Sequence, residues 1–281
     1  MFPLALGLLS GLTWGAADFV GGLLTRRNPL ATVMVVGQGA GLLFMVVLVL
    51  ITGDTVPSPT ALWASVGAGL AGAIGLAALY QGLSIGPMGI VAPTASLSVT
   101  VPLAAGLLQG DRPSALQFVG IGLAGVGIVL ASRPQQDPGA PGPARVGRGV
   151  AYGLVAAVFL GLLLVGIDRA GDESAVWAAL VVRMTSVPLF LVAFLVTTDR
   201  RAPSRRDGAL MAGVGLADNG ANVLFAIASA RGLLSLVTVL ASLYPVTTVL
   251  LARTVLHERM ARHQVAGVAL AFAGVAAIAL G

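Results

Sequence analysis

The chain has 281 residues, of which 57% are hydrophobic and only 10% are charged, and its mean hydropathy is +0.96. Soluble domains carry about 25% charged residues, so this composition excludes an ordinary soluble protein and predicts one that is embedded in lipid. The 16 basic residues, all of them arginine, outnumber the 11 acidic ones. The absence of cysteine excludes disulfides and thiolate metal sites, and the absence of lysine excludes a Gly-Lys-Ser/Thr loop for ATP.

Apolar segments follow one another along the chain, most of them near the length of about 20 residues that a helix needs to cross the hydrocarbon core. Because unpaired backbone groups are not tolerated in lipid, we expect helices and not isolated strands. The first segment has no basic stretch before it and no cleavage site after it, which favours a retained span over a signal peptide. The ten predicted helices cover residues 3–24, 31–51, 61–82, 88–109, 115–131, 149–167, 176–197, 209–230, 233–254 and 264–280.

The distribution of arginine predicts how these helices are oriented. The loops after the odd-numbered predicted helices hold 12 arginines, the other loops hold 3, and Arg183 lies inside a predicted helix. The positive-inside rule therefore places both termini outside the cell membrane. This explanation of the basic balance is better than nucleic-acid binding, so we expect no nucleic-acid partner.

Residues 133–148 are rich in proline and glycine and predict a flexible linker. They separate a first group of five helices, residues 1–132, from a second group, residues 149–281. The two groups repeat each other: Ala95-Ser96-Leu97 matches Ala241-Ser242-Leu243 at an offset of 146. At an offset of 147, matches continue between Gln117, Gly120, Leu123, Ala124, Gly127 and Gln264, Gly267, Leu270, Ala271, Gly274.

Because five spans separate the copies, the second copy enters the membrane from the opposite side. The predicted fold is an all-α integral membrane protein with ten transmembrane helices as two inverted five-helix repeats in one transmembrane domain, a pattern found in many secondary transporters.

The sequence around the repeated motif resembles a known family. The segment 78–87, Ala-Leu-Tyr-Gln-Gly-Leu-Ser-Ile-Gly-Pro, and the segment 91–97 resemble the third and fourth helices of EamA-type proteins of the drug/metabolite transporter superfamily. Residues 230–235, 242–247 and 257–259 resemble the second copy, and Trp14-Gly15 is common in the first helix. The resemblance implies two inverted bundles, a central cavity and alternating access, but it does not imply a particular substrate.

Ionisable residues inside a span are costly and often functional. Asp18 lies in the first predicted helix, Arg183 in the seventh and Asp218 near the middle of the eighth. At about 1.5 Å of rise per residue, the depths of Arg183 and Asp218 differ by about 6–8 Å, so we predict that they approach each other. A transport role is the hypothesis for both aspartates; the alternative is a structural role, and for Arg183 a structural ion pair is favoured.

Further candidates for a substrate site share a helix face with these charges or lie near prolines. Trp14 lies four residues before Asp18, and Asn222 lies four residues after Asp218, with Asn219 beside them. Prolines at positions 93, 102 and 245 predict bends that either expose backbone groups to a cavity or are filled by neighbouring side chains. The polar residues near these bends are Tyr80, Gln81, Thr94, Ser96, Ser242 and Tyr244.

Two motifs carry no function in this interpretation. Gly120-x-Gly122-x-x-Gly125 matches a dinucleotide fingerprint, but no strand precedes it, so it indicates helix packing. Helices 115–131 and 264–280 share a pattern of small residues without an ionisable group in their interiors, so we expect both at the periphery. His257-Glu258 and His263 resemble a zinc motif, but the histidines are six residues apart and are expected to be solvated loop residues.

The predicted function is a secondary transporter, expected to be an exporter, of small polar or amphipathic metabolites, with proton coupling left open. The alternatives are a channel-like facilitator and, much less favoured, a membrane-embedded enzyme. The expected partners are a small-molecule substrate and the lipid bilayer. No metal or cofactor is expected, and a monomer is expected with a dimer left open.

Overall fold

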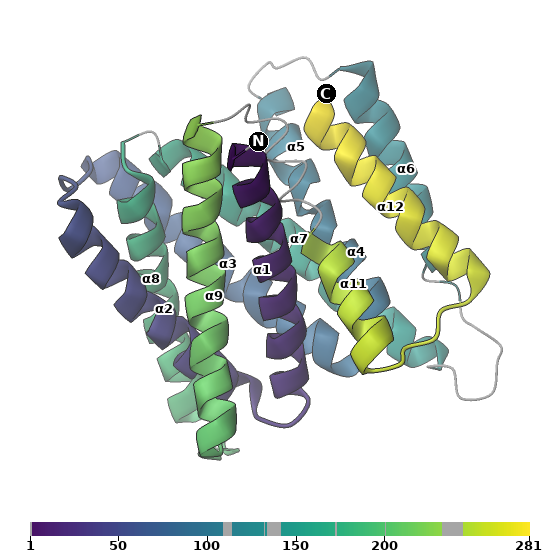
Figure 1. The fold of residues 1–281 in the computed structure, drawn as a ribbon, viewed down its shortest axis with the longest axis horizontal. Helices are drawn as coiled ribbons and strands as arrows, with labels where there is room; N and C mark the ends of the chain where they lie inside the picture. The colour runs from purple at the N-terminus through teal and green to yellow at the C-terminus, as the bar shows by residue number, and fades with distance from the viewer. Residues whose placement is uncertain are drawn as a thin grey trace.

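The computed structural model describes residues 2–108, 114–131, 133, 142–171, 173–199, 201–231 and 244–281. Within these ranges every regular element is a helix (Figure 1). The helices are α1 (Phe2–Thr25), α2 (Leu30–Thr52), α3 (Pro59–Ile85), α4 (Met88–Ala95), the 3₁₀ turn η1 (Ser96–Val99), α5 (Thr100–Leu108), α6 (Ala115–Ala131), α7 (Pro143–Gly171), α8 (Ala175–Val196), α9 (Arg205–Arg231), α11 (Tyr244–Val255) and α12 (Arg262–Leu280).

Five helices are long and apolar enough to cross a membrane, namely α1, α2, α3, α7 and α8. Shorter apolar helical stretches cover Met88–Pro102, Ala115–Ala131 and Arg262–Ile278. Large apolar side chains on the outside of these helices, such as Leu50 and Trp63, are more than 70% exposed, as expected where lipid replaces water as the solvent. The prediction of an all-helical membrane protein is confirmed, and the count of ten spans stays a prediction.

The fourth predicted span is divided into α4, η1 and α5. Pro93 lies inside α4 and lacks the N–H that would continue the hydrogen-bond ladder. The hydroxyl of Ser96 donates to the carbonyl oxygen of Pro93 at 2.7 Å, and the backbone then tightens into the 3₁₀ turn. The helix is therefore interrupted shortly after Pro93, near the bend that the sequence predicts.

The predicted start of the sixth helix differs from the structure, and the predicted start of the ninth lies outside the described residues. Helix α7 begins at Pro143, so the last residues of the predicted linker 133–148 are helical; proline suits a first helical turn, where its N–H would have no intrahelical partner. Helix α11 starts at Tyr244 within the described residues, and Ser242 lies outside them.

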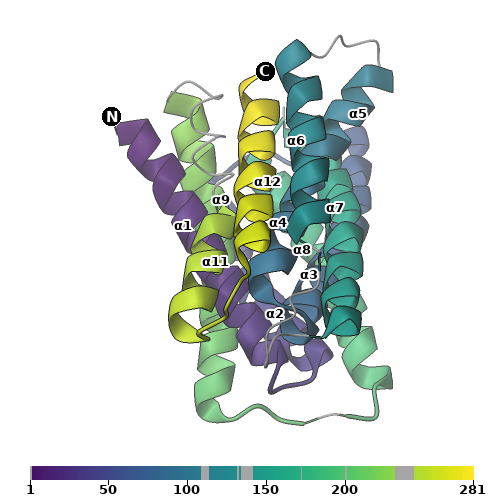
Figure 2. The ribbon, with the colours of Figure 1, turned by 90° about the vertical axis from the view of Figure 1, so that its right-hand side faces the viewer.

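The helices form a bundle with α6 and α12 side by side at one edge and with α2 and α8 at the other (Figures 1 and 2). Helices α1, α9, α3 and α7 lie between these edges. The start of α1 and the end of α12 lie at the same end of the bundle in both views. This end is called the terminal end below, and the opposite one the loop end.

The contacts between helices repeat when the two halves are exchanged. Helix α1 packs on α9 as α7 packs on α3, and α1 packs on α11 as α7 packs on α4. Helix α2 packs on α9 as α8 packs on α3. Most of these contacts join one half of the chain to the other, so each half provides much of the surface on which the other half folds.

The pair α6·α12 shows the same exchange at the level of single residues. A side chain at Gly127 would strike the backbone of Gly267 and Ala271, and one at Gly274 would strike the backbone of Gly120 and Ala124. These two sets of contacts interchange at an offset of 147. The prediction that these helices pack through small residues is therefore confirmed, and the structure shows that they pack on each other.

The starts of α3 and α9 also correspond across the two halves. Ser58 caps α3 by accepting from the N–H of Ala61, and Ser204, 146 residues later, accepts from the N–H of Asp207 at the start of α9. Each start is contacted by a loop of the other half. Glu173 accepts from the hydroxyl and N–H of Ser58, both at 2.6 Å, and Asn28 donates to Asp207 at 3.1 Å.

Candidate substrate site

Arg183 lies in the interior of the bundle, where three side chains from two other helices accept from its guanidinium. Its Nη2 donates to Asp218 at 2.6 Å and its Nε donates to Asn219 at 3.1 Å. Its Nη1 donates to Gln38 of α2. The side chains of Arg183 and Asp218 are only 13% and 20% exposed, so the pair is largely removed from solvent and membrane lipid. The predicted approach of these two residues is confirmed, and the contact is direct.

Glycines bring α2 and α9 close enough for this cluster to form. A side chain at Gly215 would strike the carbonyl of Gly37, and one at Gly41 would strike the amide of Asn219. Asn219 is 1% exposed, and its amide nitrogen donates to the carbonyl of Gly215 at 2.8 Å, which turns its oxygen toward Arg183. The packing of α2 on α9 therefore orients one of the three acceptors, Asn219, independently of its contact with Arg183.

Asp18 of α1 adds a second carboxylate near the cluster. It is partly buried, and its charge lies within electrostatic range of Asp218, Tyr80 and Tyr244. Among the residues that the structure describes, no hydrogen-bond partner of its carboxyl group is found. Asp18 therefore lies within electrostatic range of Asp218, whose ion-pair partner is Arg183, and the region holds two carboxyl groups and one guanidinium.

Aromatic residues from both halves lie along α1, the helix that carries Asp18. The ring of Trp14 lies 6.0 Å from that of Phe225 of α9, tilted by 39°. The ring of Tyr80, which is 4% exposed, lies against Gly21, where any side chain would collide with it. Tyr244 contributes its backbone carbonyl beside Gly15. The structure thus brings Tyr80 and Tyr244 to α1, which carries both Trp14 and Asp18.

The remaining predicted site residues lie elsewhere or have other contacts. The hydroxyls of Thr94 and Ser96 are buried and donate to carbonyls of their own helix region. Asn222 donates to the carbonyl of Asp218, one turn earlier in α9. Gln81 lines a separate cavity at the loop end. Ser242 lies outside the described residues, and a substrate role for the whole set stays a prediction.

Sequence reasoning missed Gln38 and Glu258 as polar contact residues. Gln38 is 5% exposed and lies in an otherwise apolar stretch of α2, and this isolation was its only signal. Glu258 has a side chain that is only 18% exposed, whereas the neighbouring His257 is exposed, as expected for a loop. His263 lies in the first turn of α12 and not in a loop. In the described part of the chain, no group of three or more metal-ligating side chains occurs.

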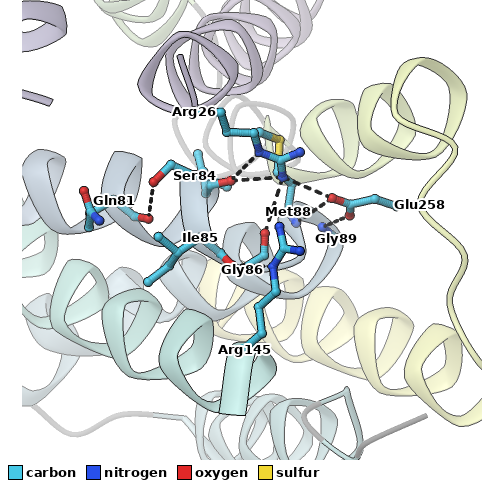
Figure 3. A network of polar contacts seen from close by, with 10 residues as sticks. Arg26, Gln81, Ser84, Ile85, Gly86, Met88, Gly89, Arg145 and Glu258 are labelled. Atoms are coloured by element: carbon cyan, nitrogen blue, oxygen red, sulfur yellow. Dashed lines mark hydrogen bonds and ion pairs between the residues drawn. The ribbon is translucent and has the colours of Figure 1, made fainter. Parts of the chain in front are cut away.

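Glu258 joins several helix ends at the loop end of the bundle (Figure 3). It accepts from the N–H groups of Met88 and Gly89, both at 3.1 Å, and from Arg26 at 3.4 Å. A carboxylate at a helix N-terminus satisfies free N–H groups and complements the helix dipole. Arg26 in turn donates to the carbonyls of Leu83 and Gly86. This loop-end network connects α1, α3 and α4 to the segment after α11.

Comparisons with known proteins agree with this architecture. A model of the EamA-like transporter family matches residues 1–133 and again residues 147–280. A solved structure titled "Crystal structure of protein" superposes with a TM-score of 0.70 over 98% of this chain and 95% of that chain, at 18% identity. No curated protein sequence matches the chain.

Proposed function

This chain belongs to the EamA-like transporter family, and we propose that it is a secondary transporter, acting as an exporter of small polar or amphipathic metabolites across the cell membrane. The observation that carries the proposal is the charged cluster around Arg183 inside the bundle. A buried ion pair with an additional unpaired acid is costly in a membrane unless it binds a ligand or a proton.

The charge balance favours a ligand with a positive group. Arg183 is already occupied by Asp218, Asn219 and Gln38, whereas Asp18 has no hydrogen-bond partner among the described residues. An ammonium group or a proton would neutralise the excess carboxylate, while an anion would be repelled. We therefore propose cationic or zwitterionic substrates, with Asp18 and Asp218 as the acceptors and Trp14, Tyr80 and Tyr244 as the neighbouring surface.

The transport cycle that we propose is alternating access by ten spans in two inverted halves, with both termini outside. The exchange of helix contacts between the halves and the common end of the two termini support this topology. A reporter that is active only in the cytoplasm, fused after Gly281, should give no signal. A strong signal there would overturn the orientation.

Counterflow in liposomes tests the function directly. Purified protein is reconstituted, loaded with one unlabelled compound, and exposed to the labelled compound outside, over a panel of amino acids, polyamines and organic cations. A carrier accumulates label transiently because internal substrate drives exchange. A channel-like facilitator, the alternative, equilibrates without this overshoot. Absence of both across the panel would contradict a cationic or zwitterionic substrate.

A further inference from the structure

A polar cavity lies at the loop end of the bundle, away from the Arg183 cluster. It has a volume of about 530 Å³ and is formed by the ends of α1 and α3 and the start of α7. Its polar lining comes from Thr25, Arg26, Asn28, Gln81, Ser84 and Arg145, and none of its lining residues is acidic. None of its lining residues belongs to the central cluster.

The two arginines of this cavity have hydrogen-bonding capacity left over. Arg145 donates from Nε to the carbonyl of Ile85 at 2.7 Å, and its two terminal nitrogens have no partner among the described residues. Arg26 shares Nη2 among Leu83, Gly86 and Glu258 at 3.2–3.4 Å, and its Nη1 makes no hydrogen bond to a described residue. Figure 3 shows the two side chains reaching toward the same turn, Ile85–Gly86, from opposite sides.

Gln81 and Ser84 add neutral polar groups beside the arginines. The hydroxyl of Ser84 donates to the carbonyl of Gln81 at 2.8 Å, so its oxygen can still accept. The side-chain amide of Gln81 has no hydrogen-bond partner within the described ranges. Both terminal nitrogens of Arg145, Nη1 of Arg26 and the amide nitrogen of Gln81 are thus left without a partner among the described residues. The lining contains no carboxylate, although Glu258 pairs with Arg26 from outside it, so the cavity favours an anion over the cationic ligands proposed for the central site.

We propose that this cavity binds a phosphate group, held by Arg145 and Arg26 with Gln81 beside them. Guanidinium groups bind phosphate through paired, charge-assisted hydrogen bonds, and basic recesses at helix ends on the cytoplasmic side take anionic headgroups. The cavity lies where helices α1 and α3 end, and its lining also includes the apolar side chains of Leu30 and Ile85. A phospholipid headgroup and a soluble phosphate compound share the chemistry that this lining recognises.

The test uses the full-length protein, stripped of lipid in a neutral detergent. Two probes are titrated separately: dihexanoyl phosphatidylglycerol and inorganic phosphate. Binding is followed by calorimetry and by the shift in Tm. The variant is Arg145→Gln, which removes one charge from an exposed position and leaves the loop-end network in place. The matched control is Arg148→Gln, an exposed arginine of the same helix that does not line the cavity.

We expect at least one probe to bind the wild type, with Kd raised about tenfold in Arg145→Gln, the loss of roughly one charge-assisted contact, and unchanged in Arg148→Gln. Binding of the lipid probe alone assigns the site to a headgroup, and binding of inorganic phosphate as well assigns it to the phosphate group itself. No binding of either probe, or equal weakening by both substitutions, overturns the proposal. Neither result depends on transport, so the proposed function is tested separately.

Discussion

Arg183 of α8 and Asp218 of α9 form a direct ion pair of 2.6 Å in the interior of the bundle, across 35 positions of the chain. The pair ties two helices whose starts lie at opposite ends of the bundle. It is also the point at which α2 joins them, because Gln38 and Asn219 complete the coordination of the guanidinium. Any ligand that competes for Asp218 must therefore alter the contact among three helices at once.

Replacing either member of this pair should separate stability from transport. Arg183→Ala leaves Asp218 and the two amides of Asn219 and Gln38 without their donor, and we expect a loss of roughly 3 kcal/mol, at the low end for a buried pair because both side chains are partly exposed. Asp218→Asn keeps an oxygen that can accept from Arg183, so its cost should be roughly 1 kcal/mol. Thermal unfolding followed by tryptophan fluorescence measures both.

For transport, Asp218→Asn is the more informative of the two substitutions. Asp218→Asn should fold and express yet lose counterflow or its dependence on pH, because the charge is gone while the packing remains. Asp18→Asn is the companion variant, and it should retain stability because no described hydrogen bond is lost. Normal counterflow by Asp218→Asn between roughly pH 5.5 and pH 8, across the range where a coupled proton would be exchanged, would refute a role in transport.

The close approach of α2 and α9 should depend on individual glycines. Gly215→Ala places a methyl group onto the carbonyl of Gly37 and should destabilise the protein by roughly 1–3 kcal/mol. Gly213, on the same helix, has open space around it, so Gly213→Ala should be neutral or stabilising by up to about 1 kcal/mol. Equal Tm values for the two variants would show that the helices do not pack as described.

The loop-end network should control access to the buried start of α4. Because the chain has no cysteine, a single Met88→Cys reports on this position, which is 0% exposed. In the otherwise native protein we expect slow labelling by a water-soluble maleimide. Adding Glu258→Gln removes the charge that holds Met88, Gly89 and Arg26, and labelling should become several-fold faster. Arg27→Cys, at an exposed position, provides the control, and its labelling rate should not change.

The contact between Glu173 and Ser58 should make stability depend on pH. Hydrogen bonds from the hydroxyl and then the backbone N–H of Ser58 hold the pKa of the Glu173 carboxyl below its usual range. A lowered pKa in the folded state contributes stability above the unfolded value of about 4.3, and this contribution is lost as the pH falls through the folded value. Glu173→Gln should therefore lower Tm slightly at neutral pH, and the difference from wild type should disappear in acid.

A double-mutant cycle identifies the partner in that contact. In a Ser58→Ala background, part of the donor set is already absent, so Glu173→Gln should cost less than in the native background. An unchanged cost in that background, or a Tm difference that grows in acid, would mean that Glu173 acts through some other group.

The features that could be predicted from the sequence are those whose residues would be energetically costly in any other arrangement. A charge within an apolar segment is rare, and its depth can be counted from the helix rise, which is why the pairing of Arg183 with Asp218 was predictable. The packing of α6 on α12 was predictable because glycines recur at the same offset in both helices. These signals are local to one helix or repeated between two.

Other parts depend on contacts that no local pattern reveals. Gln38 is neutral and gives no charge signal, so its role became visible only when α2 was placed beside α8 and α9. Glu258 follows a helix end and resembles a solvated loop residue, but the start of α4 and Arg26 approach it from far along the chain. The start of α7 at Pro143 was missed because a proline-rich segment predicts a linker as readily as a helix start.

The reciprocal capping of α3 and α9 has a consequence for how the chain can be divided. Each half offers the first turn of a helix that a loop of the other half completes, and most large helix interfaces also join the halves. The protein is organised like a dimer whose two subunits happen to be covalently connected. Separate polypeptides corresponding to residues 1–131 and 142–281 should therefore be insoluble alone and should complement each other when they are made together in one cell. The linker would then ensure that the two halves are made in equal numbers, and it would contribute little to the stability of the fold.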